Sequence, residues 1–316
     1  MITSILSAAA PLMLASLGAL LTELAGVLGI FIEGFMTMGA FFSWIIAGRT
    51  GSVFLGALLT ALAGGLTGWG LARFVHKTAA NPFIAGLALN LAAEGVTGSL
   101  SQAWFGTKGV LRFPGLSVPG PVRIPFIEEL PFIGGILSGQ LPFTYIGWGL
   151  VLLGSLVIGA TPLGLRLRAS GIRPEAAVER GLHPRRYREG AWAAAAFLAC
   201  LAGAALTFRV GAYTPGGIAG RGWIALAAVY LGFRTVPGTA AAALIFALAE
   251  HIGLALQRFA ALPVTVLLGF PSALALILYS LSQGVNTRRT KGSGITPELG
   301  PQKSVRKSKR RCPEAR

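Results

Sequence analysis

Three polar side chains lie inside stretches that are otherwise apolar, and these residues are the strongest candidates for a functional role in the sequence. Glu33 lies in the apolar stretch 27–47 and is followed by Gly34. Asn90 and Glu94 are four positions apart, so a helix would place them on one face. A carboxylate inside a membrane is costly unless it is paired or faces water, and such residues often mark a substrate or ion path. The pattern therefore predicts a translocation path lined by Glu33, Gly34, Asn90 and Glu94.

Each of these residues also has a structural interpretation. Glu33 could lie near a membrane surface or accept hydrogen bonds from backbone N–H groups, and the glycine beside it permits a break in the helix. Asn90 and Glu94 could join two helices by a hydrogen bond instead of lining a path. The sequence leaves both interpretations open.

The composition sets the environment of these residues. The chain has 316 residues, of which 53% are hydrophobic and 12% charged, and its mean hydropathy is +0.68. A soluble domain carries about 25% charged residues, and a disordered chain is much less hydrophobic. Two cysteines are too few for a disulfide scaffold. The numbers leave a polytopic membrane protein.

Apolar stretches of spanning length recur along the chain. Three of them, 50–72, 190–208 and 259–287, contain no charged residue, and a spanning helix needs about 20 apolar residues. The segment 222–233 lies between two arginines and is too short to span, so we expect a half-span packed within protein. The fold class is therefore all-α and polytopic, with about eight to ten transmembrane segments. The remaining candidate spans are 2–22, 27–47, 82–102, 143–160 and 235–249.

The positive charges indicate orientation and organisation. The net charge is +16; seven arginines fall within 161–190 and ten Lys or Arg within 284–316. Basic loops stay in the cytoplasm, so we expect 161–190 and the C-terminus to be cytoplasmic. Residues 1–285 form the membrane domain, with 105–142 as a proline-rich outer loop. The polar tail 286–316 is expected to be disordered or to contact anionic lipid.

Several kinds of chemistry are excluded. The chain has no aspartate, no G-x-x-x-x-G-K-[ST] motif and no H-E-x-x-H motif, and its three histidines are far apart. We therefore expect no catalytic set, no metal and no cofactor on this chain. Nucleic acid is also an unsuitable partner, because the basic residues flank membrane segments and are not interleaved with aromatic side chains.

The arginine-rich loop contains a short helix signal. Pro174 suits the first turn of a helix, where its missing N–H costs nothing, and Glu175 then lies near the positive end. Ala176 and Ala177 favour helix, and Gly181 can end it. A helix of about seven residues is marginal in water, so it needs a partner surface.

Three stretches together carry a resemblance to one family. Residues 21–39 contain Glu33-Gly34-Phe35-Met36, and residues 80–91 read ANPFIAGLALNL. The third runs from TPLGLRLRASGIRPEAAVERGL at 161–182 through GRGWIALAAVYLG at 220–232 to residues 246–250. The chain thus resembles the permease subunits of ATP-binding cassette (ABC) importers for nucleosides and simple sugars, a group related to branched-chain amino acid permeases. The resemblance covers most of residues 21–285.

The resemblance implies a function without chemistry on this chain. The subunit would form the translocation path and work by alternating access in the bacterial inner membrane. Its partners would be a second permease chain, an extracytoplasmic binding protein and ATPase subunits that bind ATP and magnesium. The short cytoplasmic helix would couple to the ATPase through Gly171, Arg173, Pro174, Glu175, Ala176, Ala177, Glu179 and Gly181.

Two alternatives remain. The cargo could be a branched-chain amino acid. The chain could also be an ion- or proton-coupled secondary transporter, in which the carboxylates inside the spans would carry the coupling.

Overall fold

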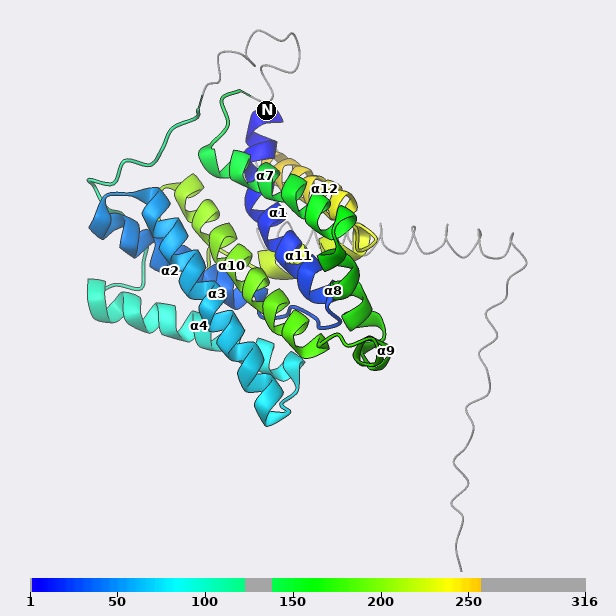
Figure 1. The fold of residues 1–316 in the computed structure, drawn as a ribbon. Helices are drawn as coiled ribbons and strands as arrows, with labels where there is room; N and C mark the ends of the chain where they lie inside the picture. Colours follow the sequence, from blue (N-terminus) through cyan, green and yellow to red (C-terminus); the bar gives the residue numbers. More distant parts are fainter. Residues whose placement is uncertain (1, 123–137, 257–316) are drawn as a thin grey trace, which may run out of the picture. The chain divides into compact units, whose positions relative to one another are not determined.

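The computed structural model describes residues 2–122 and 138–256, and their secondary structure is helical apart from two isolated β-bridges. The expected span 259–287, the tail 286–316 and the central part of the outer loop (123–137) lie outside the described residues. The helices are α1 (Ile2–Leu24), α2 (Ile32–Thr50), α3 (Val53–Thr78), α4 (Pro82–Phe105), α7 (Pro142–Ala160), α8 (Pro162–Ile172), α9 (Pro174–Glu179), α10 (Pro184–Val210), α11 (Arg221–Leu231) and α12 (Val236–Leu256) (Figure 1).

The all-α membrane fold class is confirmed. In the described part of the chain, six helices are long and apolar enough to cross a membrane: α1, α3, α4, α7, α10 and α12. Within the expected stretch 27–47, the helix begins only at Ile32, and the segment between the end of α1 and this residue is not helical. The expected short segment 222–233 corresponds to α11, an 11-residue helix.

Helix α10 forms the centre of the bundle and packs against α1, α2 and α3 (Figure 1). In its most apolar 18-residue stretch, 83% of the residues are buried. Small residues in the helices let their neighbours approach closely. A Cβ on Gly39 of α2 would collide with the backbone of Cys200. Gly64 and Gly68 of α3 likewise face α10, and a Cβ on Gly68 would lie 3.0 Å from the Trp192 carbonyl oxygen. The G-x-x-x-G spacing in α3 therefore marks a helix contact.

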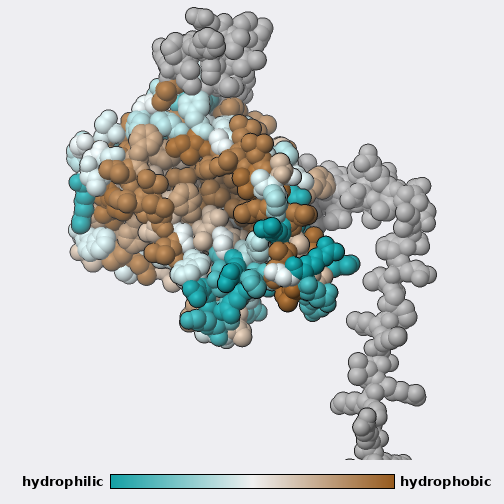
Figure 2. All heavy atoms as spheres, in the orientation of Figure 1, coloured by the Kyte–Doolittle hydropathy of each residue, from teal (hydrophilic) through white to brown (hydrophobic). Residues whose placement is uncertain are grey.

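Helices α4 and α7 are the most exposed of these six spans. In their most apolar 18-residue stretches, only 17% and 28% of the residues are buried. Large apolar side chains such as Ile84 on α4 and Leu156 on α7 are exposed there. Figure 2 shows hydrophobic side chains across the middle of one face and hydrophilic ones toward the end at which Figure 1 places α8 and α9. A water-exposed bundle would not tolerate such faces, whereas lipid would cover them.

Proline starts five helices, in the first turn of each. Pro174 starts α9 as expected, and Gly181 follows the helix with a φ of +74°. Proline suits this position because the first N–H groups of a helix have no partner within it. Each of these prolines thus marks the residue at which its helix begins, and so sets where the preceding connection ends.

Candidate functional site

The carboxylate of Glu33 binds the beginning of α11. Its Oε1 accepts the Gly220 N–H at 2.8 Å, and its Oε2 accepts the Gly222 N–H at 2.6 Å. Glu33 itself lies in the first turn of α2. One negative charge therefore faces the positive N-terminal ends of two helices, where an anion is favoured. The contacts agree with the structural interpretation of Glu33, which supplies acceptors to backbone donors that would otherwise be unpaired.

Asn90 of α4 holds the non-helical segment between α1 and α2. Its side-chain oxygen accepts the Gly34 N–H at 2.8 Å, and its amide donates to the Ile30 carbonyl at 2.8 Å. Gly86, one turn earlier on α4, lies so close that a Cβ there would be 3.1 Å from the Phe31 nitrogen. Non-helical backbone at membrane depth needs such partners, since lipid offers none.

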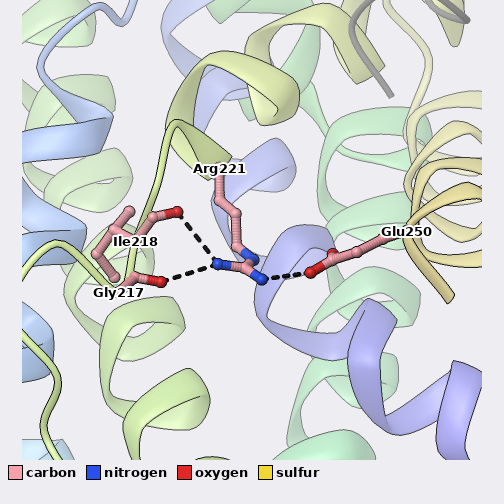
Figure 3. Close-up of polar contacts among 4 residues, drawn as sticks. All are labelled: Gly217, Ile218, Arg221 and Glu250. Carbon is pink, nitrogen blue, oxygen red and sulfur yellow. Dashed lines mark hydrogen bonds and ion pairs between the residues drawn. The ribbon is translucent and has the colours of Figure 1, made fainter. Parts of the chain in front are cut away.

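Arg221 ties the loop before α11 to α12 (Figure 3). Its Nη1 donates to the Gly217 carbonyl at 2.8 Å and to the Ile218 carbonyl at 3.3 Å, and its Nη2 pairs with Glu250. The guanidinium side chain is 23% exposed and that of Glu250 32%. A planar group with several donors suits this task, because it reaches two carbonyls and a carboxylate together.

Two cavities lie on either side of the loop that joins α10 to α11. The larger, about 470 Å³, is lined by residues of α2, α4, this loop and α11, among them Glu33, Asn90 and Glu94, and by Lys108 from the segment after α4. The smaller, about 270 Å³, is lined by residues including Arg209, Arg221 and Glu250. The two share lining residues, namely Thr37, Tyr213, Gly216 and Ile218. Polar and charged side chains thus reach two neighbouring cavities whose lining is otherwise mostly apolar.

The structure brings together the residues expected to line a path. Glu33, Asn90 and Glu94 line the larger cavity, and Gly34 binds Asn90 beside it. The polar side-chain atoms of Glu33 and Asn90 bind backbone groups. The exposed side chain of Glu94 lines the cavity and makes no hydrogen bond or ion pair within the described residues.

Sequence reasoning missed four residues of this region. Lys108, Tyr213 and Trp223 line the larger cavity, and Arg221, paired with Glu250, lines the smaller one. Arg221 carried a signal, since it is a charge that directly follows a glycine-rich turn within an apolar region. The exposed Trp223 was interpretable only as an interface anchor without the fold.

The residues of the expected coupling loop form a separate cluster at the end of the bundle. Glu175 and Glu179 are exposed on α9, and Ile172 is 77% and Val178 60% exposed beside them. The loop is anchored to α1: a Cβ on Gly26 would be 2.8 Å from the Gly171 backbone. This end of the bundle therefore presents apolar and charged side chains on a fixed support.

Metal chemistry finds no support in the described part of the chain. No group of three or more His, Cys, Asp or Glu side chains there could hold a metal ion.

The described helices include six of spanning length and a shorter one, α11, beside a cavity that polar side chains reach, and this arrangement is typical of a membrane transport protein. Sequence comparison specifies the class further. Residues 1–286 match the family described as the permease component of the branched-chain amino acid transport system, and the chain belongs to this family.

Three relatives align over most of the chain. The guanosine ABC transporter permease protein NupQ of Bacillus subtilis is 30% identical over 85% of this chain and 87% of its own length. The nucleoside ABC transporter permease protein NupC of Lactococcus lactis is 30% identical over 75% and 77%. The putative glucose ABC transporter permease protein TsgC13 of Haloferax volcanii is 29% identical over 72% and 69%. No solved structure matches the chain significantly.

Proposed function

We propose that this chain forms the translocation path of an ABC importer for a nucleoside or a simple sugar. The observation that carries the proposal is the family match over residues 1–286, together with relatives named for guanosine, nucleoside and glucose transport. The cavity lined by Glu33, Asn90 and Glu94 supports it, because it provides polar lining inside an apolar bundle. Cargo would pass this cavity by alternating access.

The α8–α9 end is proposed as the coupling surface for an ATPase subunit that binds ATP and magnesium. Ile172 and Val178 support this role, because large apolar side chains so exposed at a charged end suit burial by a partner. The contact between Gly26 and Gly171 joins this surface to the end of α1. A second permease chain and an extracytoplasmic binding protein complete the proposed importer.

The same end is proposed to face the cytoplasm. The loop 161–190 carries seven arginines, as positive-inside orientation requires. Arg234, just before α12, pairs with Glu23 at the end of α1, so α12 starts at this end and leaves it. The expected span 259–287 would then return the C-terminus to the cytoplasm, and the basic tail could contact anionic lipid there.

Uptake in cells tests the transport function. Cells with and without the gene would be given labelled guanosine, ribose, glucose or leucine, before and after ATP depletion with the proton gradient intact. The proposal predicts gene-dependent guanosine or sugar uptake that stops without ATP. ATP-dependent uptake of leucine alone would assign the cargo to branched-chain amino acids. Uptake that persists without ATP and collapses with the gradient would make the chain a secondary transporter.

A charge reversal tests the coupling surface. Glu175→Lys should abolish uptake and cargo-stimulated ATP hydrolysis while the protein still reaches the membrane, because the exposed residue has no folding role visible in its contacts. Thr78→Lys places the same lysine side chain at an exposed position outside the loop and should leave uptake intact. Normal transport by Glu175→Lys would reject this surface.

A further inference from the structure

Three side chains line the larger cavity without a hydrogen bond, ion pair or ring stacking of their own within the described residues. From them we propose that the cavity recognises a nucleoside, with Trp223 stacking on the base and Glu94 accepting hydrogen bonds from hydroxyl or amino groups. The inference rests on the proposed transport function and narrows it to one class of cargo.

Most polar groups around the cavity are already occupied. Glu33 binds two backbone N–H groups with its two oxygens, and Asn90 bonds backbone with both its oxygen and its nitrogen. The hydroxyl of Thr37 donates to the Glu33 carbonyl, and that of Thr97 donates to the Ala93 carbonyl. These residues build the wall of the cavity, and little of their hydrogen-bonding capacity is left for cargo.

Glu94, Lys108 and Trp223 remain. Neither Glu94 nor Lys108 has a hydrogen bond or ion pair through its side chain within the described residues, although both line the same cavity. Trp223 is 45% exposed, and its ring stacks on no other aromatic ring in the part of the chain that the structure describes. The cavity therefore offers one acceptor, one donor and one open aromatic face.

These three groups fit a neutral ligand that has a flat ring and several hydroxyl groups. An indole face favours an aromatic partner, and bases stack on aromatic side chains whatever their sequence identity. Glu94 can accept from ribose hydroxyls, and Lys108 can donate to a base carbonyl. A free sugar has no aromatic ring to place on Trp223.

The volume of the cavity and the charges that line it narrow the class of cargo further. About 470 Å³ lies in the range of cavities that enclose organic ligands of nucleoside size, and leucine would leave much of it empty. Two carboxylates, those of Glu33 and Glu94, line the cavity against one lysine. This balance disfavours a nucleotide, because its phosphate would add negative charge to an acidic, partly desolvated site.

Maximal uptake rates of labelled guanosine and labelled ribose would test the inference in cells that carry the complete importer. The rate at saturating cargo reports on the permease, and immunoblots of membranes correct for the amount of each variant. Loss of a stacking side chain weakens binding of a base by about 5- to 150-fold. We therefore expect Trp223→Ala to lower the guanosine rate at least several-fold, whereas Trp223→Phe keeps a stacking face and most of the rate.

Two further variants make the test specific. Glu94→Gln keeps the size of the side chain but loses its charge, so it should also lower guanosine uptake. Trp69→Ala removes a tryptophan of α3 that is 39% exposed and does not line the cavity, so it should transport like the wild type.

The outcomes separate the two proposals. Wild-type guanosine rates in both Trp223→Ala and Glu94→Gln would overturn the recognition by these residues and leave the importer intact. ATP-dependent uptake of ribose but not guanosine would overturn the nucleoside assignment alone. Absence of any gene-dependent uptake that requires ATP would instead reject the transport function itself.

Discussion

Glu33 and Gly222 are 189 positions apart, and the Glu33 carboxylate accepts the Gly222 N–H at 2.6 Å. The approach is possible only because residue 222 is glycine, since a Cβ there would lie 2.6 Å from the same oxygen and 2.7 Å from the Glu33 Cα. The first turn of α2 is thus joined directly to the first turn of α11. This contact sets the position of the half-helix and of the cavity wall that continues from it.

Removal of the Glu33 carboxylate should destabilise the protein. Glu33→Ala leaves two N–H groups unpaired, and a buried unpaired donor costs about 1–3 kcal/mol. Glu33→Gln keeps one oxygen acceptor and should lose less. Thermal unfolding of the purified proteins in detergent would rank them wild type, then Gln, then Ala. Equal unfolding temperatures for the wild type and Glu33→Ala would contradict a structural role.

Alanine substitutions at Asn90 and Glu94 should have very different effects on the unfolding temperature, although the two residues share one face of α4. Asn90→Ala leaves the Ile30 carbonyl and the Gly34 N–H without their partner, so the unfolding temperature should fall by several degrees. Glu94→Ala removes a side chain that has no such partner and should unfold like the wild type. The same thermal assay compares them, and equal losses in the two variants would show that the Asn90 contacts contribute no stability.

Arg221→Lys should be damaging even though it conserves charge. A lysine cannot bind the Gly217 and Ile218 carbonyls and the Glu250 carboxylate in the planar geometry of a guanidinium. The loss of one or two hydrogen bonds corresponds to about 1–3 kcal/mol, read as a lower unfolding temperature.

Arg209→Lys provides the matched control for Arg221→Lys. Arg209 lines the same smaller cavity but makes no hydrogen bond or ion pair through its side chain within the described residues. We expect this variant to unfold close to the wild-type temperature. A larger loss in Arg209→Lys than in Arg221→Lys would show that the contacts drawn in Figure 3 do not stabilise the loop.

Much of the fold was predictable because it depends on local features. The length of an apolar stretch predicts a span, and the described spans begin or end close to the expected bounds. Pro174 placed the start of α9 correctly, because proline at the first turn is a property of the backbone alone. The two arginines around 222–233 likewise indicated a helix too short to cross, and α11 confirms it.

The site was predictable only in part. A polar group in an apolar span must face something polar, so Glu33, Asn90 and Glu94 stood out in the sequence, and the structure places all three around one cavity. Their role in a translocation path stays a prediction. Their partners were not predictable. Glu33 meets α11 from 187 positions away and Asn90 meets Ile30 from 60, and no periodic pattern in the sequence encodes such distances.

The order of apolar and polar residues is enough to establish that the chain is a bundle of membrane helices, which helices are long, and which polar residues need partners. Hydrophobic burial in lipid and local backbone sterics decide these properties residue by residue. The packing of the helices adds that the side chains of Glu33 and Asn90 bind backbone groups, whereas those of Glu94 and Trp223 line the larger cavity. The reason is that a side chain's role depends on which donors lie within about 3 Å of it, and packing of distant segments sets that distance.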